Sequence, residues 1–134
     1  MQNNRYSMFV GRFQPFHDGH KWLIEQRLKL GKRILIAAMD IHDTEPEKNP
    51  FKIDDVIEKI ESIFSKEIEQ GLVKVISIPP VESINYGRTV GYEIIEHVPP
   101  TEIKEISATN IRKKMRKEQW FIGYMDNPEL EKQL

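Results

Sequence analysis

Two histidines flank a glycine where a short apolar stretch gives way to a segment with helical periodicity. His17, Gly19 and His20 belong to residues 11–20, GRFQPFHDGH. Histidines three residues apart share one face of a helix, and the backbone N–H groups at a helix start favour an anion. Imidazoles can donate hydrogen bonds to phosphate oxygens and stabilise a transition state that becomes more negative. The spacing indicates phosphate chemistry, with His17 and His20 as candidate catalytic residues.

The beginning of the same run adds two groups that suit an anion. Gly11 would let a ligand approach the backbone closely at the end of a strand. Arg12 could form a forked contact with the same anion. Taken alone, the histidine pair is also typical of a turn with a satisfied histidine, or of half a metal site. His42 is a possible third ligand, but it sits in an expected loop with no motif around it, so no metal site is predicted.

A second candidate group lies near the other end of the chain, in residues 106–112, ISATNIR. Ser107 and Thr109 stand at an expected helix start, where hydroxyls and unpaired N–H groups cap the helix or bind anions. Arg112 follows Thr109 by three residues, so it shares its face one turn later. Taken alone, this segment also describes a capped, basic surface helix.

The hydrophobic pattern predicts the elements that must position these groups. Strands are expected over 6–10, 34–39 and 73–78, and helices over 18–30, 54–70 and 107–117. Gly31 and Gly71 follow the first two helices, as C-terminal caps do. The pattern also favours a short strand over 84–86, strand or helix over 92–98, and a short extended piece at 105–106.

The alternation of strands and helices, with short linkers, predicts an α/β fold. Right-handed βαβ units would form a Rossmann-like, doubly wound parallel sheet with helices on both faces, in a single domain over residues 1–134. Ligands of such sheets bind beyond the carboxyl ends of the strands. Both candidate groups fall at those ends.

Composition narrows the classes of partner. The net charge of −1 gives no electrostatic case for nucleic acid or membrane. The absence of cysteine excludes a disulfide framework, a thiolate zinc site and a cysteine nucleophile. No apolar run approaches the roughly 18 residues of a membrane span, and the polar N-terminus lacks a signal-peptide core. We therefore expect a cytoplasmic protein, and leave a homo-oligomer open.

Together the two groups resemble the paired signatures of the nucleotidyltransferase superfamily with a cytidylyltransferase-like fold. That superfamily includes cytidylyltransferases, archaeal-type nicotinamide-mononucleotide adenylyltransferases and pantetheine-phosphate adenylyltransferases. Its first signature, Gly-Arg-Phe-x-Pro-x-His-x-Gly-His, matches residues 11–20, and its second, Ile-Ser-x-Thr-x-x-Arg, matches residues 106–112. Asn49-Pro50-Phe51 also looks like the archaeal adenylyltransferase pattern ahead of the second helix. The region between that helix and the second signature is shorter here than in the archaeal enzymes.

The resemblance implies transfer of a nucleoside monophosphate from CTP or ATP to a phosphorylated small-molecule acceptor, with release of pyrophosphate. It implies Mg²⁺ bound mainly through triphosphate oxygens, and catalytic roles for His17, His20 and Arg112. The implied nucleotide-binding residues are Gly11, Arg12, Phe13, Gly19, Arg88, Ser107, Ala108 and Thr109. A surface role is an equal alternative for Arg88.

The sequence leaves other hypotheses open. It does not show which base is bound, because backbone groups recognise the base of CTP or ATP in this fold. The compact chain favours a cytidylyltransferase-type reaction, with a nicotinamide-mononucleotide or other adenylyltransferase as the alternative. A non-catalytic nucleotide-binding or sensor module is the alternative from another class. An aminoacyl-tRNA synthetase-like fragment is disfavoured by the short chain and the lack of a lysine-rich signature.

Overall fold

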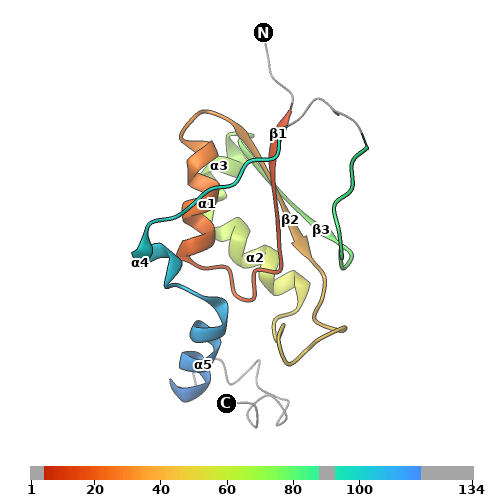
Figure 1. Ribbon diagram of the computed structural model, residues 1–134, viewed down its shortest axis with the longest axis vertical. Coiled ribbons are helices and arrows are strands. Elements are labelled where there is room, and N and C mark those ends of the chain that lie inside the picture. Colours follow the sequence, from red (N-terminus) through yellow and green to blue (C-terminus); the bar gives the residue numbers. More distant parts are fainter. Residues whose placement is uncertain (1–4, 88–92, 119–134) are drawn as a thin grey trace.

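A computed structural model of the protein describes residues 5–87 and 93–118 (Figure 1). In chain order the elements are β1 (Tyr6–Gly11), α1 (Asp18–Leu28), β2 (Arg33–Met39), α2 (Ile53–Ile63), α3 (Ser65–Glu69), β3 (Val73–Ile78), α4 (Thr101–Lys104) and α5 (Ala108–Glu118). Within these ranges, no helix is long and apolar enough to cross a membrane.

The three strands form one parallel sheet in the order β1-β2-β3, with β2 in the centre. Tyr6 pairs with Arg33 and Gly11 with Ala38, so β1 and β2 stay paired along their whole length and end at the same edge of the sheet. The continuous apolar stretch of β2 is what a central, covered strand requires. The predicted α/β class, the parallel sheet and the alternation of strands and helices are confirmed.

The core lies on one face of this sheet. Ile34 and Ile36 of β2 are fully buried and pack in one cluster with Ile24 of α1 and Ile60 of α2. Right-handed crossovers in the order β1-β2-β3 place successive helices on the same face, so α1 and α2 lie together. They do not supply the second helix layer of a doubly wound sheet. On the opposite face Met8 of β1 is 56% exposed.

The predicted second helix is divided into α2 and α3 at Phe64. Its backbone leaves the helical region, with φ −107° and ψ 25°. The Phe64 ring is buried and lies edge-on to Phe16, with 5.9 Å between ring centroids. This break turns the side chain into the core. Gly31 and Gly71 follow α1 and α3 with φ of +76°, the left-handed conformation expected of terminal glycines.

The C-terminal half differs from prediction in three places. Residues 84–86 form no strand, because no described strand pairs with them and Ile84 and Tyr86 stay exposed. Residues 93–98 form neither helix nor strand, although the ring of His97 stacks on Phe9 of β1 at 6.2 Å. No described extended piece fills 105–106, because the short α4 and its C-terminal turn occupy 101–105.

Gln14 joins the loop after β1 to the start of α2. Its side chain is 3% exposed. Its Nε2 donates to the carbonyl of Phe51 at 2.9 Å, and its Oε1 accepts from the N–H of Phe51 at 2.8 Å. One amide thereby pairs both backbone groups of a buried residue, as burial requires.

Replacing Gln14 with Ala is expected to lower the free energy of unfolding by about 2–4 kcal/mol, because breaking each of its two buried hydrogen bonds to the Phe51 backbone costs roughly 1–3 kcal/mol. Urea unfolding measures the change. Gln26→Ala is the matched control, since it removes a hydrogen bond from Gln26 to Trp22 on α1 and is expected to cost less than about 1 kcal/mol. Equal losses in both variants would contradict the bridging role.

Candidate functional site

The carboxyl end of β1, the start of α1 and the helix α5 lie at the same end of the molecule (Figure 1). The chain leaves β1 through a tight turn at Phe13, whose φ is +53°. A Cβ on Gly11 would lie 2.8 Å from the Phe13 ring, so the glycine lets that buried ring fold back over the strand end. The turn then leads directly to His17.

His17 and His20 cap α1 reciprocally. The N–H of Gly19 donates to Nδ1 of His17 at 3.0 Å, and the N–H of His17 donates to Nδ1 of His20 at 3.1 Å. This is the geometry of a capping box, with imidazole nitrogens in place of the usual oxygens. The two rings stack with centroids 3.7 Å apart and planes inclined by 21°.

The cap fixes where each imidazole carries its proton. An Nδ1 that accepts a hydrogen bond is unprotonated, so the neutral ring bears its hydrogen on Nε2. Both Nε2–H groups of His17 and His20 are thus donors, and no other residue of the described ranges accepts from them. A pair of parallel donors at a helix start is suited to phosphate oxygens.

Both histidines are held neutral. Burial lowers the pKa of His20 to about 3, with further lowering by the neighbouring His17 and the Lys59 charge. Burial also lowers the pKa of His17, where the Asp18 charge opposes the effect and the Lys59 charge adds to it. The site therefore presents neutral imidazole donors.

Aromatic side chains set the orientation of His20. The Phe13 ring meets it edge-on with centroids 5.0 Å apart, and the Phe16 ring packs against it at 5.3 Å. Phe16 is itself anchored on Phe64. Because these rings are buried, the imidazole has little freedom to rotate away from the cap.

The second sequence group reaches the first through Arg112. Its guanidinium donates to the carbonyl oxygen of Gln14, in the loop that ends at His17, and to Oγ1 of Thr109 at 3.4 Å. Ser107 caps α5, since its Oγ accepts from the N–H of Asn110 at 3.1 Å. Ala108 is the first residue of α5. The expected juxtaposition of residues 11–20 and 106–112 is therefore present.

Arg12 forms an ion pair with the loop after β2. Its guanidinium pairs with Glu45 at 3.5 Å, and both side chains are about half exposed. The pair links the loop after β1 to the loop after β2. Arg88 lies outside the described residues.

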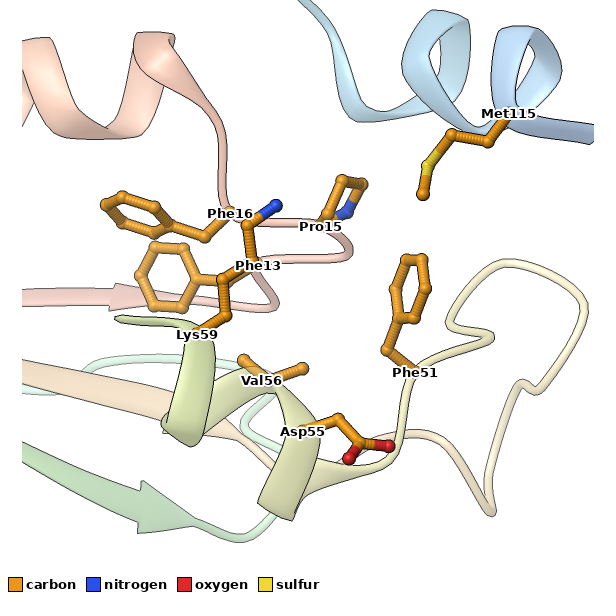
Figure 2. A pocket seen from close by; sticks show the side chains of 8 residues that line it. All are labelled: Phe13, Pro15, Phe16, Phe51, Asp55, Val56, Lys59 and Met115. Carbon is orange, nitrogen blue, oxygen red and sulfur yellow. The ribbon is translucent and has the colours of Figure 1, made fainter. Parts of the chain in front are cut away.

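A cavity of about 110 Å³ lies between the loop after β1, α2 and α5 (Figure 2). Its lining is mostly apolar, with two charged side chains from α2, Asp55 and Lys59. The lining residues are Phe13, Pro15, Phe16, Phe51, Asp55, Val56, Lys59 and Met115. Figure 2 shows Met115 extending from α5 toward Phe51. The sequence pattern indicated Asp55 only as a residue of a helix start, and it gave no indication that Lys59 lines a site.

Residues 8–74, half of the chain, match the family described as cytidylyltransferase-like. The chain belongs to this family of nucleotidyltransferases. It is 30% identical to the nicotinamide-nucleotide adenylyltransferase of Thermococcus onnurineus (strain NA1), over 81% of this chain and 71% of that protein. The corresponding protein of Archaeoglobus fulgidus is 26% identical over 72% of this chain and 56% of its own length. The phosphopantetheine adenylyltransferase of Cytophaga hutchinsonii is 35% identical over 47% of this chain and 40% of its own length.

In this member of the cytidylyltransferase-like family the donors at the site suit an anion better than a cation. They are imidazole N–H groups, a guanidinium and the N–H groups of a helix start. Across residues 5–87 and 93–118, no group of three or more histidine, aspartate or glutamate side chains could hold a metal ion. A protein-built metal centre is not part of the described site.

Gly19→Ala is expected to weaken binding of a nucleoside triphosphate by about 10–100-fold, because a displaced His17 ring would lose a hydrogen bond to a charged phosphate, worth roughly 1.5–3 kcal/mol. The new Cβ would lie 2.8 Å from Cε1 of His17 and force the ring to move. Stability should change by less than about 1 kcal/mol, since the better helix propensity of alanine offsets a weaker cap. Titration calorimetry and urea unfolding measure the two effects.

Gly87→Ala is the matched control, because an added Cβ there meets no atom of residues 5–87 or 93–118 within 4 Å. Normal triphosphate affinity in Gly19→Ala would contradict the requirement for glycine beside His17.

The neutral state of His20 predicts a pH dependence of stability. Its pKa is about 3 in the folded protein and 6.5 in the unfolded chain, so the unfolded state binds more protons below pH 6.5. The free energy of unfolding is therefore at its full value above pH 6.5, and it decreases as the pH falls from 6.5 toward 3. His20→Asn should therefore lose less stability than the wild type between pH 7 and pH 4, in urea unfolding. Parallel losses would argue against a neutral, buried His20.

Proposed function

We propose that this protein transfers a nucleoside monophosphate from ATP or CTP to a phosphorylated small-molecule acceptor and releases pyrophosphate. The observation that carries the proposal is the hydrogen bond from Arg112 to the carbonyl of Gln14. It joins segments 98 positions apart, so that the start of α5 and the histidine pair face the same end of β1. Family membership supports the class of reaction.

The reaction needs positioning more than it needs a base. An oxygen of the acceptor phosphate attacks the α-phosphorus, and the bond from that phosphorus to the bridging oxygen of the leaving pyrophosphate breaks. Because the acceptor phosphate is already anionic, no strong general base is required, and charge stabilisation dominates. The neutral Nε2–H groups of His17 and His20 would donate to the phosphate oxygens where negative charge grows.

In this proposal, the remaining site residues predicted from the sequence each contact a different part of the nucleotide. Arg112 would hold the β- and γ-phosphates, together with the start of α5 at Ser107, Ala108 and Thr109. The backbone of residues 11–13 would line the nucleoside, and Gly19 leaves room for the His17 ring. Arg12 and Arg88 are retained as proposed nucleotide contacts, with Arg12 released from Glu45 on binding.

Mg²⁺ fits this site as an ion held by the substrate. The site residues are hydrogen-bond donors, and Mg²⁺ prefers phosphate oxygens and waters when few carboxylates are present. When bound, the ion would neutralise charge on the leaving pyrophosphate. The protein residues would orient the phosphates that carry it.

The names of the relatives guide the choice of substrates to test. Those at 30% and 26% identity are nicotinamide-nucleotide adenylyltransferases, which favours ATP as the nucleotide to test first. A cytidylyltransferase reaction with CTP is the second candidate, named by the family as a whole. Cytoplasmic location and homo-oligomerisation remain predictions from the sequence.

The decisive experiment measures pyrophosphate release with ATP and CTP against a panel of phosphorylated acceptors. Nicotinamide mononucleotide and phosphopantetheine belong in that panel because relatives are named for them. Release with one pair would identify the reaction. Tight triphosphate binding without release in any pair would favour the non-catalytic nucleotide-binding module instead.

His20→Ala is expected to lower turnover by about 10²–10³-fold, as for loss of a transition-state donor. His97→Ala is the matched control, because His97 stacks on Phe9 outside the capping pair and should leave turnover unchanged. Circular dichroism checks the fold of both variants. Full activity in His20→Ala would refute the proposed role.

A further inference from the structure

We propose that Lys59 of α2 is a further triphosphate-binding residue, contacting phosphate oxygens beside His17 and His20. The proposal rests on the nucleotidyltransferase function proposed above. It adds a residue that belongs to neither sequence signature and comes from a different helix.

The placement of Lys59 is the first argument. It lines the same cavity as Phe13 and Phe16, the two rings that pack against His20. Figure 2 shows its side chain extending from α2 toward the loop that carries these two phenylalanines. Met115 of α5 lines the same cavity, so Lys59 lies between the loop after β1 and the helix that carries Arg112.

Electrostatics give the second argument. The positive charge of Lys59 lowers the pKa of both His17 and His20, so it acts on both rings at once. Asp55 lies one helical turn earlier and lines the same cavity, but forms no ion pair with Lys59 within 4.0 Å. In the described ranges the ammonium has no hydrogen-bond or ion-pair partner.

The third argument is the charge balance of the site. His17 and His20 are neutral donors, so the positive charge there comes from Arg112 and from Arg12, which is paired with Glu45. A triphosphate brings several negative charges, which two guanidinium groups, one of them paired with a carboxylate, do not fully offset. A lysine ammonium on a flexible stem binds phosphate as a point charge with three donors. Lys59 is exposed enough to reach a ligand and close enough to act on both imidazoles.

The test is calorimetric binding of inorganic tripolyphosphate and of ATP to the full chain. Lys59→Ala should weaken both affinities about tenfold, the lower range for a hydrogen bond to a charged group. Lys59→Arg should restore most of the affinity, because it keeps the charge. Lys74→Ala is the matched control, since Lys74 is exposed near the amino end of β3, away from the site.

A second readout separates contact from structural damage. Removing the Lys59 charge should raise the pKa of both histidine rings in NMR titrations, without loss of thermal stability. Wild-type affinity in Lys59→Ala, with Arg112→Ala weakened, would overturn the role of Lys59 and leave the proposed function standing. Failure of the wild type to bind tripolyphosphate, ATP and CTP would overturn both proposals.

Discussion

The site depends on one residue, Gln14, that engages three segments at once. Its side-chain amide pairs both backbone groups of Phe51, and its own carbonyl accepts from Arg112. The loop after β1, the start of α2 and the helix α5 are therefore all held in position by hydrogen bonds to one residue, Gln14. A buried amide with all its partners is rigid because each lost bond leaves a desolvated group unpaired. The positions of the histidines and of Arg112 share this constraint.

The histidine pair shows how backbone geometry can decide side-chain chemistry. Each Nδ1 is occupied by a backbone N–H, so the proton lies on Nε2. Burial against Phe13 and Phe16 then suppresses protonation of His20. A neutral imidazole in a fixed orientation requires no reorganisation before it donates, which is the advantage of a preorganised donor over a mobile cation. Capping and proposed catalysis thus use opposite nitrogens of the same rings.

Much of the architecture could be predicted from the sequence. The apolar runs located β1, β2 and β3, and the parallel sheet then placed residues 11–20 at the carboxyl end of β1. Residues 106–112 follow α4 and no strand, and they reach the same place through the hydrogen bond from Arg112 to Gln14. The strand expected over 84–86 was wrong because β-forming residues need a partner strand, which local pattern does not reveal. The Gln14 bridge was also invisible, since it joins residues 37 positions apart through side-chain direction.

The same limit explains why Lys59 carries no signal in the sequence. On α2 it is one exposed lysine among several charged residues, and its neighbour Ile60 accounts for the helical pattern. What distinguishes it is the cavity it lines and the two imidazoles its charge reaches, both of which exist only after α1 and α2 pack on one face. Neutral donors from α1 and a charge from α2 are thereby separated onto different helices. In the proposed function, this separation would let burial lower the pKa of the histidines while the Lys59 ammonium keeps its charge for the phosphate.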